Sequence, residues 1–169
     1  MIKEYKKRIG IFEIEIRESG ILTFKKRLNN LIMNTILDEE VQIYQGVAPD
    51  LEIMHCAIGD DDGTSYPLAA DNYKLGNEVY RVPVEAGPTK IDTGYLTTEF
   101  VITKSEANGE TIKEIGIYVS TASEDWAAGA GADTGKLMSR VYMVPNVEKT
   151  SSKEITIRRI DIVQRPTIV

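Results

Sequence analysis

Apolar and charged residues alternate from Phe12 to Arg17 within the segment 11–17. The apolar set is Phe12, Ile14 and Ile16, and the residues between them are charged. Side chains on a β-strand point alternately to its two faces, so this pattern is typical of a strand with one buried face. The sequence therefore predicts a strand over residues 11–17.

The hydrophobic period changes after residue 20. Apolar residues then recur at intervals that suit a turn of helix: Phe24, Leu28, Leu31, Ile32 and Ile36. Lysine and asparagine occupy most positions between them. The spacing predicts an amphipathic helix over about residues 20–38. Its apolar face would pack on the sheet of its own chain or fill a groove on a partner.

From residue 47 onward the pattern stays extended, without a second helical period. Six segments bounded by Gly, Pro, Asn and Asp are predicted strands: 51–58, 78–85, 95–103, 111–119, 137–144 and 154–163. Such a run favours a mainly β fold, an antiparallel β-sandwich or small barrel, over alternating β and α units. We expect residues 1–46 to pack on the body or serve for attachment, and residues 47–169 to form the sandwich body.

Asn108 and Gly109 lie between two of the predicted strands. Asn-Gly is preferred in a type I′ turn, because both central residues of that turn have positive φ. The pair therefore predicts a hairpin that joins strand 95–103 to strand 111–119.

An acidic turn follows the first strand of the body. Residues 59–65 read Gly-Asp-Asp-Asp-Gly-Thr-Ser, a composition similar to a calcium-binding loop. An EF-hand loop has acids at alternate positions, glycine at the sixth position and glutamate at the twelfth. Counted from Asp60, glycine stands fourth and the twelfth residue is Asp71. The spacing favours a solvated turn over a specific cation site.

A second connection, residues 120–135, is rich in small residues and contains the single tryptophan, Trp126. Connections of this length without regular structure are commonly functional or mobile. Trp126 could pack on its own domain, on a neighbouring subunit or on a ligand. The small residues beside it would let the backbone lie flat while the indole fills a pocket, as at interface hot spots. We predict a subunit or partner contact made by Trp126, Ala127, Ala128 and Gly129.

Composition and charge narrow the classes of function. The chain has 169 residues, the length of one compact domain, with 20 basic against 26 acidic residues and a net charge of −6. A protein that coats nucleic acid would carry the opposite sign. No stretch approaches the roughly 18 apolar residues of a membrane span, and the basic start lacks the apolar core of a signal peptide. We expect no nucleic-acid partner and no membrane span.

The sequence holds few groups for metal or nucleophilic chemistry. Cys56 is the single cysteine and His55 the single histidine, so an intramolecular disulfide is excluded and an ordinary zinc site lacks ligands. As neighbours on a strand, these two side chains would point to opposite faces and could not share a proton. We expect no metal and no cofactor.

Catalytic signatures are missing from the sequence as well. It contains no Gly-x-Ser-x-Gly, Walker or His-Glu-x-x-His motif, and no Gly-x-Gly-x-x-Gly after a strand. The carboxylate pairs Glu52 with Glu99 and Glu99 with Glu114 could support glycoside cleavage only if the fold brought them together. Since nothing in the pattern does so, we expect that the protein is not an enzyme.

Several blocks of the body follow one another in a distinctive order. Ile-Met-His-Cys-Ala-Ile-Gly at 53–59 precedes the acidic turn, a Pro-Leu pair at 67–68 and a strand that carries Arg81. Later blocks are Ile-Lys-Glu-Ile-Gly-Ile-Tyr at 112–118, Lys-Leu-Met-Ser-Arg-Val at 136–141 and Lys-Thr-Ser-Ser-Lys-Glu-Ile-Thr-Ile at 149–157. In order and spacing these blocks resemble the phage tail-collar and tail-fibre family of virion proteins over roughly residues 51–163.

The resemblance implies a structural component of a phage or phage-like tail, at a fibre base, baseplate or collar. Such a protein would form a homo-oligomer, a trimer or a hexamer, and join other tail or baseplate proteins. It would reside in the virion tail after assembly in the host cytoplasm. The alternative is a carbohydrate-binding, receptor-recognition module of such a particle, which would contact a host-surface glycan.

Two features bear on how far the resemblance extends. Gly116 in mid-strand permits close backbone approach or a bulge, which would suit a subunit that packs on copies of itself. The first 45 residues match the family less well, and the loop 120–135 is longer than the usual turn of the family. The position within the tail therefore stays open.

Overall fold

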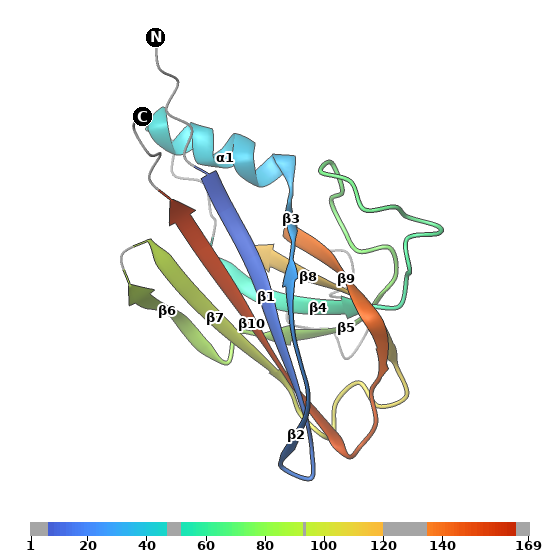
Figure 1. Cartoon of the computed structure of the whole chain (residues 1–169). Coiled ribbons are helices and arrows are strands. Elements are labelled where there is room, and N and C mark those ends of the chain that lie inside the picture. The colour runs from blue at the N-terminus through green and yellow to red at the C-terminus, as the bar shows by residue number, and fades with distance from the viewer. Residues whose placement is uncertain (1–6, 47–51, 93, 120–134, 165–169) are drawn as a thin grey trace.

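The computed structural model describes residues 7–46, 52–92, 94–119 and 135–164. Within these residues the chain forms ten strands and one helix (Figure 1). The elements are β1 (Lys7–Glu18), β2 (Ile21–Asn29), β3 (Leu31–Ile32), α1 (Asn34–Tyr44), β4 (Ile53–Gly59), β5 (Glu78–Pro83), β6 (Ala86–Asp92), β7 (Tyr95–Ile102), β8 (Thr111–Val119), β9 (Lys136–Glu148) and β10 (Lys153–Gln164).

The strands form two antiparallel sheets. Sheet A has the order β2-β1-β10-β7-β6, and sheet B has the order β3-β9-β8-β4-β5. Both sheets contribute to one core, in which Ile14 of β1 and Ile157 of β10 meet Ile115 and Ile117 of β8. The predicted mainly β fold with antiparallel sheets is confirmed, and the two sheets share this core in the manner of a β-sandwich.

At both edges of the sandwich the chain passes from one sheet to the other within one or two residues. β2 pairs with β1 as far as Asn29, and β3 begins to pair with β9 at Leu31. β5 pairs with β4 as far as Pro83, and β6 begins to pair with β7 at Ala86. Strands that bend and change sheets make corners in this way. The chain therefore joins the two sheets at both edges.

The helix predicted over residues 20–38 is wrong. That segment holds β2, β3 and only the start of α1. Phe24 and Leu28 are four residues apart, a spacing that suits one face of a helix and equally one face of a strand. In β2 both pack against the core, while the ammonium of Lys26 between them donates to the carbonyl of Val144. Because Lys26 occupies an inward-facing position of β2, the sequence does not show the alternation of apolar and polar residues that is typical of a strand.

The hairpin predicted at Asn108 and Gly109 is also wrong. β7 belongs to sheet A and β8 to sheet B, so residues 103–110 form a crossover between the sheets. The residues with positive φ there are Ala107 and Gly109, at 50° and 92°. The amide of Gly109 donates to the carbonyl oxygen of Lys149 at 2.9 Å, so the crossover packs on the connection from β9 to β10.

The other predicted strands correspond to β1, β4, β5, β7, β8, β9 and β10. β6 has no counterpart among the predictions, because its sequence begins Ala-Gly-Pro, residues that are rare inside strands. Residues 7–32 supply the N-terminal strands, and β1 is an inner strand of sheet A, between β2 and β10.

Candidate functional site

The predicted subunit or partner contact lies outside the described residues. This applies to Trp126, Ala127, Ala128 and Gly129, and the contact stays a prediction. The described part of the chain offers four other places to consider: the acidic turn after β4, the outer face of sheet B, the core between the sheets and the outer face of sheet A.

The carboxylates of the acidic turn accept hydrogen bonds from groups of the same turn and so stabilise its conformation. The Asp61 carboxylate accepts hydrogen bonds from the amides of Gly63 and Tyr66, each at 3.1 Å. Asp62 accepts from the Thr64 hydroxyl at 2.6 Å and from the Thr64 amide at 3.1 Å, and these bonds lower the pKa of Asp62. Among the residues that the structure describes, no group of three or more His, Cys, Asp or Glu could hold a metal ion.

Arg140 of β9 and Glu114 of β8 form a buried ion pair on the outer face of sheet B. Arg140 Nε donates to Glu114 Oε2 at 2.7 Å, and neither side chain has exposed surface. The same guanidinium donates to Asn72 Oδ1 at 2.8 Å and to the carbonyl oxygen of Tyr66 at 2.9 Å. These bonds tie the loop of residues 60–77 to the sheet.

Two glycines let this loop approach the sheet closely. A Cβ on Gly59 would lie 2.6 Å from the carbonyl oxygen of Asn77. A Cβ on Gly116 would lie 2.7 Å from Leu75 Cδ2 and 2.9 Å from Leu137 Cδ1. The neighbours of Gly116 are thus side chains of the same chain, one on the loop and one on β9, and the close backbone approach or bulge stays a prediction.

A second buried ion pair lies beside the first. Arg81 of β5 donates to both carboxylate oxygens of Glu78, at 2.7 Å each. Its guanidinium lies 4.1 Å from the ring centroid of Tyr118, and the Tyr118 hydroxyl accepts from the amide of Leu75 at 3.2 Å. The loop thus covers part of the outer face of sheet B, and the buried Arg140 and Arg81 are paired with carboxylates of their own chain.

The groups considered for catalysis do not converge. Cys56 lies in the core, where burial raises the pKa of its thiol. Glu99 is in sheet A and pairs with Arg158, whereas Glu114 is in sheet B and pairs with Arg140. The carboxylate pair Glu99 with Glu114 is therefore not brought together. Glu52 is exposed, just before β4.

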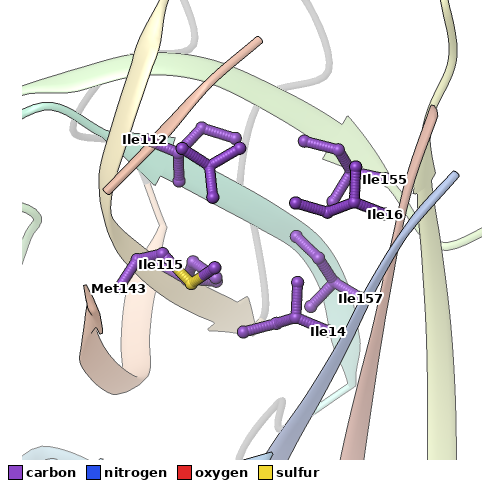
Figure 2. A pocket seen from close by; sticks show the side chains of 8 residues that line it. Ile14, Ile16, Ile112, Ile115, Met143, Ile155 and Ile157 are labelled. Atoms are coloured by element: carbon purple, nitrogen blue, oxygen red, sulfur yellow. The ribbon is translucent and has the colours of Figure 1, made fainter. Parts of the chain in front are cut away.

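A small cavity lies in the core between the sheets (Figure 2). Its volume is about 10 Å³, near the lower limit for one water molecule, which would also need two or more polar partners. Its lining is entirely apolar: Ile14, Ile16, Ile112, Ile115, Met143, Val147, Ile155 and Ile157. The cavity is a packing gap between branched side chains and not a ligand site.

The outer face of sheet A carries a row of alternating charges across four strands. Arg27 of β2, Glu13 of β1, Arg158 of β10 and Glu99 of β7 stand side by side in the strand register. Arg27 Nε lies 2.9 Å from Glu13 Oε2, Arg158 NH1 lies 3.3 Å from Glu13 Oε1, and Arg158 Nε lies 2.7 Å from Glu99 Oε2. We call these four residues the ionic row.

The ionic row is extended by a neighbouring pair. Lys25 Nζ lies 2.8 Å from Glu15 Oε1, and Arg158 NH1 lies 3.2 Å from the same oxygen. The hydrogen bond from Lys25 holds the pKa of Glu15 below its usual value. Burial raises the pKa of Glu13, but hydrogen bonds from Arg27 and Lys25 outweigh it and lower that pKa overall.

The other half of the same face is mainly apolar, with the polar Asn29 of β2 beside Ile11 and Thr97 of β7 beside Ile160. Its apolar side chains are half-buried except for the exposed Tyr95: Ile9, Ile11, Ile160, Ile162 and Tyr95. We call these five residues the apolar half. An open hollow joins it to Leu37 of α1.

In the described residues, no helix is both long and apolar enough to span a membrane.

The buried ion pairs and the ionic row give little signal in the sequence. Arg140, Glu13 and Arg158 each look like solvated charges on a strand, because nothing local shows which residues will cover them. Whether a charged residue on a strand forms an ion pair can be inferred only when the neighbouring strand and its register are known. Comparison with protein-family models, curated proteins and solved structures finds no match to this chain.

Proposed function

We propose that this chain is a structural component of a phage or phage-like tail, at a fibre base, baseplate or collar. It assembles as a homo-oligomer and connects tail parts, so its partners are copies of itself and other tail or baseplate proteins. Its place is the tail of the virion, after assembly in the host cytoplasm. It acts without a catalytic step, a metal or a cofactor.

The observation that carries this proposal is where the resembling blocks lie in the fold. Block 53–59 is β4, block 112–118 lies in β8 and block 136–141 lies in β9. These three strands are neighbours in sheet B, and Arg81 lies on β5 at the side of β4. Three blocks that are far apart in the sequence thus form one continuous piece of sheet B, which supports a shared architecture over a chance likeness of strands, while block 149–157 runs into β10 of sheet A.

The buried charges support a scaffolding role. Arg140 binds Glu114, Arg81 binds Glu78, and Arg159 binds both carboxylate oxygens of Asp161 at 2.7 and 3.2 Å. Each of these three guanidinium groups is paired with a carboxylate of its own chain. The Arg140–Glu114 pair joins two strands, whereas the other two pairs lie within β5 and within β10, and Arg159 also donates to the Ser139 hydroxyl of β9. The contacts that join strands hold the sheets in one arrangement, which suits a protein that holds neighbouring subunits in position.

The test is the mass of the isolated chain and its presence in particles. Sedimentation velocity at several concentrations should give a stable oligomer, and tail particles purified from the source organism should contain the chain. A chain that stays monomeric at every concentration and does not enter particles would contradict the proposal.

The alternative, a carbohydrate-binding module, has one observation in its favour. Tyr73 is 65% exposed on the loop over sheet B, and its ring meets that of Tyr66 edge to face with centroids 6.5 Å apart. Sugar sites commonly expose such aromatic side chains. However, the Tyr66 ring also stacks on Arg140, with 5.0 Å from the guanidinium carbon to the ring centroid. A host-surface glycan that binds the wild-type chain but not Tyr73→Ala, with Tyr95→Ala as control, would favour this alternative.

A further inference from the structure

The outer face of sheet A is large and lies at the surface of the described structure. In Figure 1, β1, β10 and β7 run side by side, with α1 at one end. Strands are about 4.8 Å apart and rise about 3.4 Å per residue, so five strands of this length cover on the order of 700 Å². A standard interface buries about 800 Å² on each partner. The face is therefore of the size that a stable protein contact needs.

The two central strands of this face carry complementary side chains at the same height. The structure describes the side chains of five outward-facing register pairs between β1 and β10, and four of them join opposite charges or two apolar side chains. They are Arg17 with Glu154, Glu13 with Arg158, Ile11 with Ile160, and Ile9 with Ile162. The fifth joins Glu15 with Thr156.

This pairing has a geometric consequence for a second copy of the chain. A two-fold axis parallel to the strands and midway between β1 and β10 would place β1 of one copy over β10 of the other at the same height. Glu13 would then face Arg158 of the second copy, because these residues share one register position. One strand further out, Arg27 would face Glu99 of the second copy in the same way.

We propose that the outer face of sheet A binds a second copy of this chain across a two-fold axis parallel to β1 and β10, with the apolar half on the apolar half and the ionic row on the ionic row. The inference rests on the proposed function, since it assigns the surface through which the homo-oligomer forms. An isologous contact joins chains in pairs, so the copy number is even. A hexamer satisfies this condition and a trimer does not.

The two halves of the face have different roles in the contact. Burial of the apolar half supplies the favourable free energy, as in the apolar centre of most interfaces. The charges of the ionic row are already paired within each chain, so their contribution is mainly to register and partner choice. A two-fold axis perpendicular to the strands that crosses the face between the ionic row and the apolar half would put Ile11 and Ile160 over charged residues, which is unfavourable.

The test exchanges the two central charges between copies. In Glu13→Arg, residue 13 would face a like-charged Arg158 of the second copy, and in Arg158→Glu the same site would hold two carboxylates. We expect each variant alone to associate at least about tenfold more weakly than the wild type. An equimolar mixture should regain association, because Glu13→Arg and Arg158→Glu chains place opposite charges across the axis. Sedimentation velocity measures the masses, and native mass spectrometry shows whether the recovered pairs contain one chain of each kind.

A second exchange repeats the test with exposed side chains, in case the central variants fail to fold. Arg27→Glu and Glu99→Arg change side chains that are 65% and 41% exposed. Each should weaken association alone, and their mixture should again form mixed pairs. The control is Val41→Lys on the exposed side of α1, which should leave the mass unchanged.

The outcomes separate the two proposals. A wild-type oligomer whose mass survives all four charge variants, or falls with Val41→Lys instead, overturns the two-fold contact and leaves the structural role standing. Weaker association of the single variants without recovery in the mixtures also overturns it. A wild-type chain that is monomeric at its highest soluble concentration overturns the two-fold contact, and its absence from purified tail particles as well overturns the structural role.

Discussion

Arg140 Nε lies 2.7 Å from Glu114 Oε2, and both side chains are completely buried. The two residues are on the neighbouring strands β9 and β8, and the loop of residues 60–77 closes over them. Taking two charges out of water costs several kcal/mol, which their attraction offsets only while both partners are present. The loop therefore stays closed over the sheet only while both Arg140 and Glu114 are present.

Glu114→Gln should remove the counter-charge of Arg140 with little change of shape. The buried guanidinium would then lack its nearest carboxylate, and we expect a loss of about 3 to 5 kcal/mol in the free energy of unfolding. Urea denaturation followed by far-UV circular dichroism measures it. The control is Glu148→Gln on an exposed position of β9, which should change the free energy by less than about 0.5 kcal/mol. Equal losses of unfolding free energy in Glu114→Gln and Glu148→Gln would show that the ion pair of Glu114 with Arg140 does not cause the loss.

Gly59→Ala should loosen the same loop from the other side. The added Cβ would lie 2.6 Å from the carbonyl oxygen of Asn77, a backbone atom that cannot rotate away. Overpacking of this kind typically costs about 1 to 3 kcal/mol. Limited proteolysis should cut within residues 60–77 faster than in the wild type, while the far-UV spectrum is unchanged. A cleavage rate equal to that of the wild type would contradict the close approach.

Most strands could be predicted because their signal is local. β1 and β8 show alternation or a continuous apolar run between turn residues, and both can be recognised without knowing the fold. β2 could not, because Lys26 occupies an inward position and interrupts the period of two. The Asn108–Gly109 pair indicates a turn, but a turn signal does not tell which sheet the next strand joins.

The candidate surfaces could not be predicted for a related reason. Glu114 and Arg140 are 26 residues apart, and their burial depends on a loop that no local pattern places over them. The ionic row needs the register of four strands at once, which is set by long-range packing. The sequence does indicate the residue types involved, and the fold decides which of them meet.

Ile36 and Leu37 on α1 should respond differently to the same change. Ile36 is 1% exposed and belongs to the core, whereas Leu37 is 42% exposed. Ile36→Ala should cost about 2 to 5 kcal/mol, and Leu37→Ala should cost less than about 0.5 kcal/mol. Thermal unfolding of the two variants side by side measures the difference. A large loss for Leu37→Ala in a chain kept monomeric would mean that α1 packs by another face.

Trp126→Ala should weaken self-association or entry into particles by about 2 kcal/mol or more, if the predicted contact holds. Folding of the single chain should be nearly unchanged. Because Trp126 is the only tryptophan, its fluorescence reports on this residue alone, and dissociation of the wild-type oligomer should shift the emission to the red. Emission that keeps the spectrum of a buried indole after dissociation would assign Trp126 to the core of its own domain.

Acid should destabilise the chain through Glu13 and Glu15. Their pKa values in the folded state lie below the ordinary value of 4.5, because Lys25 and the arginines beside them favour the ionised carboxylates. The unfolded chain therefore takes up protons first as the pH falls, so this stabilisation is complete above about pH 5 and is lost as the pH drops through the lowered pKa values. Chemical denaturation between neutral and acidic pH measures the loss.

The double variant Glu13→Gln, Glu15→Gln should be less stable than the wild type at neutral pH, and its stability should fall less steeply below about pH 5. Glu85→Gln, an exposed residue outside the ionic row, serves as the control and should keep the wild-type slope. The expected difference is one of slope, so a uniform loss of stability from the substitutions would not imitate it. Parallel curves for the wild type and the double variant would mean that Glu13 and Glu15 titrate alike in the folded and unfolded chains, and that the ion pairs of sheet A contribute nothing to stability in acid.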